Sequence, residues 1–191
     1  MSATPEALLQ RPLDSESATL ALGAALARSL PRDAHEALVV YLQGDLGSGK
    51  TTLARALLRE LGAQGTVRSP SYTLVESYEL SGLLALHLDL YRLRDASELE
   101  HLAIRDQLRA GVLLLVEWPE RAPGLLPAPD LGVELVVSTT RSSAQPVAGP
   151  PTGVGDTVQL MREVRLSAAS AAGQRWLAAL DPGHTSRINQ S

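Results

Sequence analysis

The sequence predicts a single α/β domain with a central, mostly parallel β-sheet flanked by helices, and three observations carry this prediction. Residues 44–51 read GDLGSGKT, which satisfies the pattern G-x-x-x-x-G-K-S/T. An apolar, partly β-branched run at residues 37–43 (ALVVYLQ) precedes this motif, and a helical pattern follows it directly. A second apolar run at residues 112–116 (VLLLV) has the length of a buried strand. Strand, glycine loop and helix in this order predict a P-loop NTPase domain.

Two helices are predicted around the first strand. One is expected after the capping side chains of residues 14–17 and ends near Leu30, because Pro31 follows. The other begins at Lys50, at the end of the glycine loop, and its apolar residues recur at helical spacing. Gly62 is placed to end this second helix.

The rest of the chain is predicted from the same signals. The expected elements are a hairpin of residues 72–78 and 83–90, one bent or two short helices at 96–109, paired strands at 131–137 and 158–166, and a helix at 168–180. Three segments are expected to lie outside regular structure, namely a flexible N-terminus at residues 1–12, a mobile inserted loop at 138–156 and a flexible tail at 181–191. The domain is therefore expected to span residues 13–180.

Composition narrows the class of protein. A chain of 191 residues with 45% apolar and 20% charged residues is typical of one globular unit. The absence of Cys excludes disulfides, thiolate metal sites and cysteine nucleophiles. A net charge of −4 argues against a broad nucleic-acid-binding surface, so any contact with RNA is expected to be indirect. No segment has the pattern of a signal peptide or the length of a membrane span, so we expect a cytoplasmic protein without membrane contact.

The glycine loop predicts binding of a nucleoside triphosphate with magnesium. Its glycines let backbone N–H groups turn toward phosphate oxygens, and the positive end of the following helix favours an anion. Lys50 is placed to reach the β- and γ-phosphates, and the Thr51 hydroxyl to bind Mg²⁺. The expected cofactors are ATP and Mg²⁺. The expected nucleotide-binding residues here are Asp45, Leu46, Gly47, Ser48, Gly49, Lys50, Thr51 and Thr52.

The alternative is a glycine-rich turn that precedes Lys and Thr by chance. It is disfavoured because Lys50 is the only lysine in a chain whose seventeen basic residues are otherwise arginines. This lysine occupies the one position at which the planar fork of an arginine is not a conservative replacement.

Two carboxylates are candidates to complete the site, because a P-loop needs an acidic group at the end of a neighbouring strand. Glu117 ends the run at 112–116, and Asp89 ends the run at 83–88 (LLALHL). For each, the alternative is a carboxylate that only terminates a strand. The predicted catalytic residues are Lys50, Asp89 and Glu117.

Other residues near these motifs allow two interpretations each. The segment RSPSYT at residues 68–73 fits either a γ-phosphate sensor or a polar turn. His87 fits a packed or hydrogen-bonded histidine better than a metal ligand, because it has no matched second ligand. Trp118 could flank a nucleotide, but an aromatic residue at the end of a strand is more often part of the core. Arg92 and Arg94 fit a solvated or partner-facing pair.

Five phrases in one order resemble the TsaE (YjeE) family. They are GDLGSGKTTLARALL, VRSPSYTLVESY, HLDLYRL, ELEHLAIRD and LLLVEWPER, and the resemblance covers most of residues 13–137. It implies slow hydrolysis of Mg-ATP by an accessory protein that works with TsaD and TsaB. Together they place threonylcarbamoyl on the adenosine next to the anticodon (t6A), in tRNAs that read codons beginning with A. The resemblance implies that TsaD carries out the transfer itself.

The resemblance also assigns roles to individual residues. It implies that Thr51 and Glu117 bind the magnesium and that Asp89 supports either the metal or the hydrolytic water. Arg162, in the REVRL segment, resembles a nucleotide-contacting position of the family, and residues 13–19 are expected near the adenine. Ser71 stands where the family more often has Thr, a change that keeps the hydroxyl.

Two other functions use the same motifs. A small-metabolite kinase would use Asp89 as the base for a substrate hydroxyl and would need a basic lid, for which Arg92, Arg94 and Arg105 are candidates. A nucleotide-gated adaptor would bind its partner in an ATP-dependent way, and its hydrolysis would be incidental.

Overall fold

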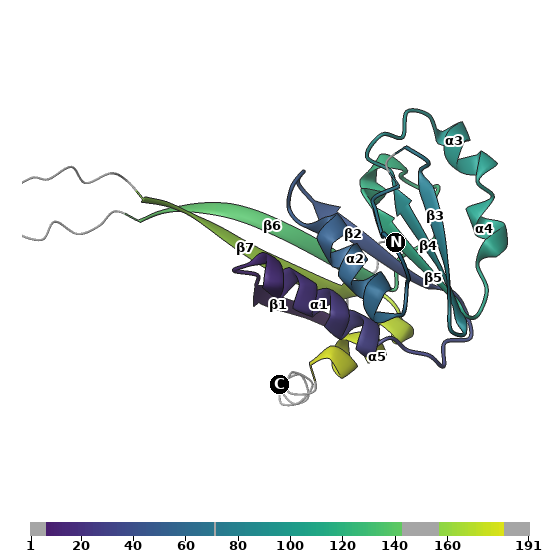
Figure 1. Cartoon of the computed structure of the whole chain (residues 1–191), viewed down its shortest axis with the longest axis horizontal. Helices are drawn as coiled ribbons and strands as arrows, with labels where there is room; N and C mark the ends of the chain where they lie inside the picture. The colour runs from purple at the N-terminus through teal and green to yellow at the C-terminus, as the bar shows by residue number, and fades with distance from the viewer. Residues whose placement is uncertain (1–6, 71, 143–156, 182–191) are drawn as a thin grey trace, which may run out of the picture.

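The computed structural model describes residues 7–70, 72–142 and 157–181 of the chain (Figure 1). Seven strands form one sheet in the order β1-β7-β6-β2-β5-β4-β3. The elements in chain order are β1 (Ala7–Pro12), α1 (Glu16–Arg28), β2 (Leu38–Gly44), α2 (Lys50–Glu60), β3 (Val75–Leu80), β4 (Leu83–Asp89), α3 (Ala96–His101), α4 (Ile104–Gln107), β5 (Val112–Glu117), η1 (Pro119–Arg121), β6 (Leu131–Ser142), β7 (Thr157–Ala168) and α5 (Ala171–Leu180).

The centre of the sheet is parallel, as the sequence predicts, and its two margins are antiparallel. Strand β2 pairs in parallel with both β5 and β6, and β4 pairs in parallel with β5. Antiparallel pairing joins β3 to β4 as the predicted hairpin, β6 to β7, and β7 to β1. Because β2, β5 and β4 run in the same direction, the residues that follow them meet at one edge of the sheet, which is where α/β proteins bind ligands.

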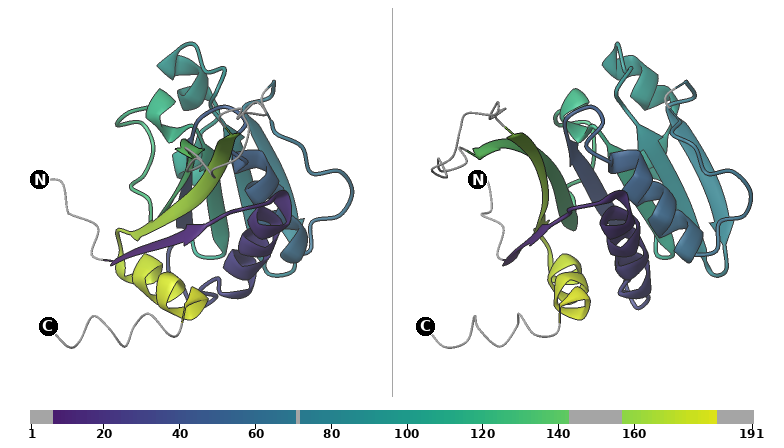
Figure 2. Two further views of the ribbon diagram at one scale, coloured as in Figure 1. Left: turned by 90° about the vertical axis from the view of Figure 1, so that its left-hand side faces the viewer. Right: turned by 60° about the vertical axis from the view of Figure 1, so that its left-hand side comes forward.

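Helices cover both faces of the sheet (Figures 1 and 2). On one face, α1, α2 and α5 bury a core rich in leucine, and the indole N–H of the fully buried Trp176 donates to the Leu26 carbonyl at 2.9 Å. On the other face, a second core includes Leu99 of α3 and Ile104 of α4. Leu, Val and Ala supply almost all of both cores, as expected for a chain without Phe.

Helices α1 and α2 pack closely because a glycine lies at their contact. A methyl group on Gly23 of α1 would stand 2.6 Å from the Leu53 carbonyl oxygen and 2.7 Å from the Ala56 Cβ, both on α2. Such distances require one helix to move away from the other. The position of α2, which begins at the glycine loop, therefore depends on this glycine.

The Gly23→Ala variant is expected to be less stable than the native protein by about 1–2 kcal/mol, because overpacking outweighs the gain in helix propensity. Propensity alone predicts the opposite sign, since glycine within a helix costs up to about 1 kcal/mol relative to alanine. Urea unfolding curves measure the difference. Leu20→Ala, at an exposed position of the same helix, is the control and should change stability by less than about 0.5 kcal/mol. An unchanged or raised midpoint for Gly23→Ala would contradict the close packing.

Residues 1–12 are not wholly a flexible N-terminus, because residues 7–12 form β1. This strand pairs with β7 from Ala7↔Ala168 to Pro12↔Glu163, and Leu9 is buried between exposed neighbours, the alternation of a half-buried strand. Residues 1–6 lie outside the described part. At the other end, Asp181 of the predicted tail forms an ion pair with Arg11 at 2.8 Å, and residues 182–191 lie outside the described part.

The first five residues of the predicted inserted loop at 138–156 belong to a strand instead. Strand β6 continues to Ser142, where it pairs with Thr157 of β7. Four of the five residues at 136–140 (VVSTT) are β-branched, which favours this extension. Because β2 pairs only with residues 131–135 of β6, the far parts of β6 and β7 form a two-stranded ribbon that projects from the sheet (Figure 1). Residues 143–156 lie outside the described part.

Candidate functional site

A cavity of about 390 Å³ lies where the central parallel strands end and α2 begins. The glycine loop, the ends of β4 and β5 and the segment before β3 all contribute to its wall. The lining residues are Leu46, Gly47, Gly49, Lys50, Thr51, Thr52, Ser69, Asp89, Tyr91, Arg92, Glu117 and Trp118. The cavity thus brings together all three predicted catalytic residues and most of the predicted nucleotide-binding residues.

Glycines allow the loop between β2 and α2 to take its shape. Gly44 has φ of 131° and packs so closely against the Leu135 carbonyl of β6 that a side chain has no room. Gly47, with φ of 79°, has open space where a side chain would be, on the cavity side. Gly49, with φ of 110°, is the N-cap of α2 and lies beside Thr19 of α1. The N-terminus of α2 therefore opens onto the cavity without a capping side chain.

Lys50 is a nearly buried cation whose partners are oxygen atoms of the loop. Its side chain is 4% exposed, and Nζ donates to the carbonyls of Gly44 at 2.6 Å and Asp45 at 2.9 Å. Burial lowers the pKa of Lys50 below the usual value for lysine, while the carboxylates of Glu117 and Glu120 oppose this shift. An anion in the cavity would stabilise the charged form in the same way.

Trp118 lines the cavity and also packs, partly buried, against the second core. The Lys50 Nζ lies 3.7 Å from the centre of its ring, a favourable cation–π arrangement, and the Tyr91 ring stands 5.0 Å away. The backbone of Trp118 is left-handed, with φ of 60°, which costs a non-glycine residue about 1–2 kcal/mol. This conformation turns the chain sharply after Glu117, and the ring faces Lys50.

Glu117 is held by a hydrogen-bond partner on each of its two carboxylate oxygens. It is 1% exposed at the end of β5, and its Oε2 accepts a hydrogen bond from the Thr51 hydroxyl at 2.8 Å. Its Oε1 lies 2.9 Å from Nε2 of His87, which is fully buried on β4. The interpretation of His87 as a hydrogen-bonded histidine is confirmed. Thr51 and Glu117, the two predicted magnesium ligands, are thus in direct contact.

Asp89 lies directly opposite Glu117 in the register of β4 and β5. The Ser69 hydroxyl donates to its Oδ2 through a short hydrogen bond, and the Tyr91 backbone N–H donates to its Oδ1 at 3.0 Å. Ser69 belongs to the predicted sensor segment RSPSYT, so this segment does reach the site. Ser71 of the same segment lies outside the described residues.

Three other predicted residues lie away from the cavity lining. Asp45 and Ser48 belong to the glycine loop, and Ser48 Oγ is buried without a hydrogen-bond partner among the described residues. Arg162 of β7 pairs with Val137 of β6, at the end of the sheet where the glycine loop lies. The Arg162 carbonyl accepts a hydrogen bond from the Leu13 N–H at 2.7 Å. Its predicted contact with the nucleotide stays a prediction.

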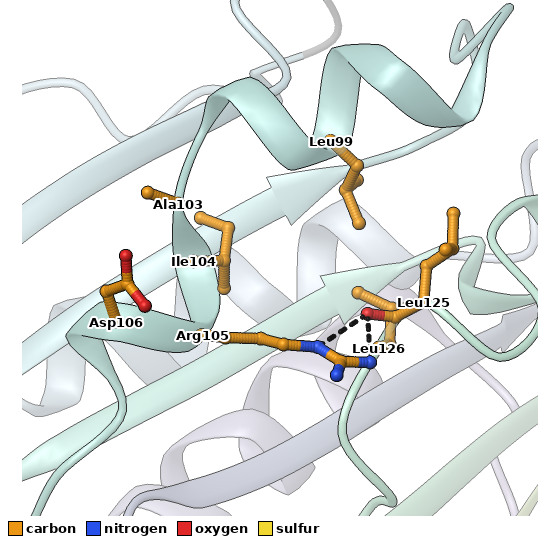
Figure 3. Close-up of a pocket in the computed structure, with 7 residues that line it drawn as sticks. All are labelled: Leu99, Ala103, Ile104, Arg105, Asp106, Leu125 and Leu126. Atoms are coloured by element: carbon orange, nitrogen blue, oxygen red, sulfur yellow. Dashed lines mark hydrogen bonds between the residues drawn. The ribbon is translucent and has the colours of Figure 1, made fainter.

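The three arginines considered for a kinase lid do not gather at one place. Arg92 lines the cavity and stacks on the exposed Tyr72 ring at 4.5 Å, and the Arg94 backbone N–H donates to Glu98. Arg105 lies at a separate cavity of about 350 Å³, where its guanidinium donates to the Leu125 carbonyl (Figure 3). It also donates to the Gly124 carbonyl. No residue lines both cavities. This placement of Arg105 argues against the lid.

Comparison with known families decides the assignment. The family model described as "Threonylcarbamoyl adenosine biosynthesis protein TsaE" matches residues 13–145. This chain belongs to the TsaE family. Every residue described at the cavity, from Leu46 to Trp118, lies within the matched region. Membership in the TsaE family confirms the resemblance noted from the five phrases.

Relatives from several bacteria carry the name tRNA threonylcarbamoyladenosine biosynthesis protein TsaE. The Haemophilus influenzae protein is 50% identical over 100 residues, which cover 52% of this chain and 63% of the relative. The Rickettsia felis protein is 37% identical over 127 residues, which cover 65% of this chain and 71% of the relative. The protein from a Synechocystis species is 41% identical over 114 residues, which cover 57% of this chain and 69% of the relative.

A solved structure supports the TsaE fold. The crystal structure of YdiB from Bacillus subtilis aligns with a TM-score of 0.59 and 23% identity, over 92% of this chain and 95% of that chain. At this identity the likeness concerns the fold alone. Among the helices in the described part of the chain, none combines the length and apolar character that crossing a bilayer requires.

Proposed function

We propose that this TsaE protein binds ATP with magnesium and hydrolyses it slowly, as an accessory ATPase in the threonylcarbamoylation of tRNA. The observation that carries the proposal is the direct contact of Thr51 with Glu117 beside the buried ammonium of Lys50. A cation and two hard oxygen ligands at the start of a helix suit a magnesium-bound triphosphate.

The residues present fit this cofactor. Nothing crosses the open side of Gly47, so a phosphate chain can approach the backbone closely there. The N–H groups of the first turn of α2 carry no side-chain cap, and Ser48 Oγ is a buried polar atom without a described partner. Asp89 and Glu117 stand opposite each other, and a divalent cation beside them would relieve the repulsion between the two carboxylates.

Each residue then has a distinct role. The Lys50 ammonium exchanges its carbonyl partners, Gly44 and Asp45, for phosphate oxygens. Thr51 Oγ1 and Glu117 Oε2 offer the oxygens for the metal, and Mg²⁺ when bound neutralises charge on the phosphates. Asp89, fixed by Ser69 and the Tyr91 N–H, accepts a hydrogen bond from the attacking water and orients it.

The biological role proposed here follows the TsaE name. The chain would act in the cytoplasm with TsaD and TsaB on the adenosine next to the anticodon, in tRNAs that read codons beginning with A. TsaD would carry out the transfer, and the net charge of −4 agrees with an indirect contact to the tRNA. ATP binding and hydrolysis would then control assembly of the complex.

Reconstitution with TsaD and TsaB tests the proposal. The chain is mixed with both proteins, with and without Mg-ATP, and three quantities are measured: complex formation by gel filtration, phosphate release, and t6A in tRNA by mass spectrometry. We expect an ATP-dependent complex, slow release of phosphate to water, and t6A that is lost when the chain is omitted. Transfer of phosphate to a small molecule would identify a kinase instead, and a complex without turnover would identify an adaptor.

A further inference from the structure

His87 lies behind the site and does not itself line the cavity. It is fully buried on β4, two residues before Asp89, and its side chain lies on the same face of the sheet as Glu117 of the neighbouring β5. Its Nε2 lies 2.9 Å from Glu117 Oε1. The other ring nitrogen, Nδ1, is buried and has no hydrogen-bond partner among the described residues.

The bonding of Glu117 determines which nitrogen carries the proton. A carboxylate only accepts hydrogen bonds, so Nε2 must be the donor to Oε1. A second proton, on Nδ1, would be a buried donor without a described partner, which is unfavourable. With the Nε2 proton directed at Oε1, His87 satisfies the one oxygen of Glu117 that Thr51 does not.

We propose that His87 is a positioning residue for Glu117. Its Nε2–H holds Oε1 against the sheet, so that Oε2 stays beside Thr51 and faces the cavity. Without this donor, the carboxylate would rotate and present its oxygens in varying positions. The inference rests on the proposed function, because the consequence of a well-placed Oε2 is tight binding of magnesium. Groups that orient a metal ligand in this way typically contribute about 10–100-fold in metal affinity.

Two polar substitutions test the position of the donor. The amide nitrogen of Gln lies about where Nε2 lies in His, whereas that of Asn lies nearer to Nδ1 and cannot reach Glu117. The measurement is the Mg²⁺ concentration that gives half-maximal ATP turnover, with nucleotide affinity in the absence of metal recorded alongside. We expect His87→Asn to raise this concentration about tenfold and His87→Gln to stay within about twofold of the native value.

The outcomes separate positioning from a purely structural role. Loss of packing at this buried site would affect both variants, and it would show in their thermal unfolding and in metal-free nucleotide binding. Equal Mg²⁺ dependence of the Asn and Gln variants would overturn the proposal. If the native protein shows no Mg²⁺-dependent nucleotide binding at all, the proposed function fails, and the bond between His87 and Glu117 is tested separately as follows.

The native protein provides this separate test. The chain has four histidines, and ¹⁵N NMR of their side chains distinguishes the two neutral tautomers. We expect one histidine with its proton on Nε2 and a slowly exchanging N–H signal that shifts in the Glu117→Gln variant. A proton on Nδ1 of His87, or a signal indifferent to Glu117, would overturn the proposal whether or not the His87 variants fold.

Discussion

Replacing Lys50 with alanine is expected to weaken ATP binding at least tenfold and to reduce turnover below detection. The side chain is the only described cation whose charged group sits inside the glycine loop, where it binds the carbonyls of Gly44 and Asp45. A hydrogen bond to a charged group contributes about 1.5–3 kcal/mol, and about 1.4 kcal/mol corresponds to tenfold in affinity. The variant should also fail to support t6A formation with TsaD and TsaB.

The control for Lys50→Ala removes a positive charge elsewhere on α2. Arg55 lies on the same helix outside the cavity lining, so Arg55→Ala should keep native ATP binding. Isothermal titration with a non-hydrolysable ATP analogue measures both variants. A Lys50→Ala protein that binds and turns over ATP normally would remove the basis of the site assignment.

The single lysine offers an independent measurement. Because Lys50 is the only lysine, an amine-reactive reagent has one side chain to modify, besides the N-terminal amine. We expect Mg-ATP to protect Lys50 from modification, as read by mass spectrometry of the tryptic peptides. Equal modification with and without nucleotide would contradict a contact between Nζ and the phosphates.

Replacing Glu117 with glutamine is expected to reduce ATP turnover at least about a hundredfold while the nucleotide still binds. The substitution keeps the shape of the side chain and lets the amide oxygen accept from His87, but it removes the charge that the metal requires. Metal-free ATP binding should be unchanged or tighter, because a buried anion beside the phosphates is removed.

Thr51→Ala provides the companion variant. It leaves Glu117 charged and removes the hydroxyl that donates to Oε2, so the Mg²⁺ requirement should rise while Lys50 still binds phosphate. Glu120→Gln, at an exposed carboxylate close to Lys50, is the control and should behave as the native protein. Glu117→Gln could stop ATP turnover but keep the ATP-dependent binding of TsaD and TsaB. Hydrolysis would then not be needed for assembly of the complex, and the protein would be a nucleotide-gated adaptor.

The centre of the fold and the positions of the candidate catalytic side chains could be predicted from local sequence. The order of strand, glycine loop and helix fixes where Lys50 and Thr51 lie, and parallel pairing places Glu117 and Asp89 at the same edge. These features depend on short-range patterns and on one rule of topology. The exact side-chain contacts, such as that of Thr51 with Glu117, depend on tertiary packing, which a local sequence pattern does not predict.

The margins of the sheet and the secondary contacts were harder to predict. Strand β1 is short, and β7, its partner among the described strands, lies far away along the chain, so no local signal marks the pair. The sequence predicts a packed or hydrogen-bonded His87 but not its partner Glu117, although the spacing of two from Asp89 places His87 and Asp89 on one face of a strand. The left-handed turn at Trp118 had no signal at all, since neither Gly nor Asn marks it.

The N-terminal strand also bears on how the protein avoids aggregation. Strand β1 covers the outer edge of β7, and a chain shortened to begin at Leu13 would leave the main-chain groups of residues 163–168 exposed as a template for strands of other molecules. The exposed edge of β1 is less prone to pair with strands of other molecules, because β1 is only six residues long and ends in Arg11 and Pro12. The six residues of β1 thus cover an aggregation-prone edge of β7 and leave a shorter edge that is less prone to pair with other molecules.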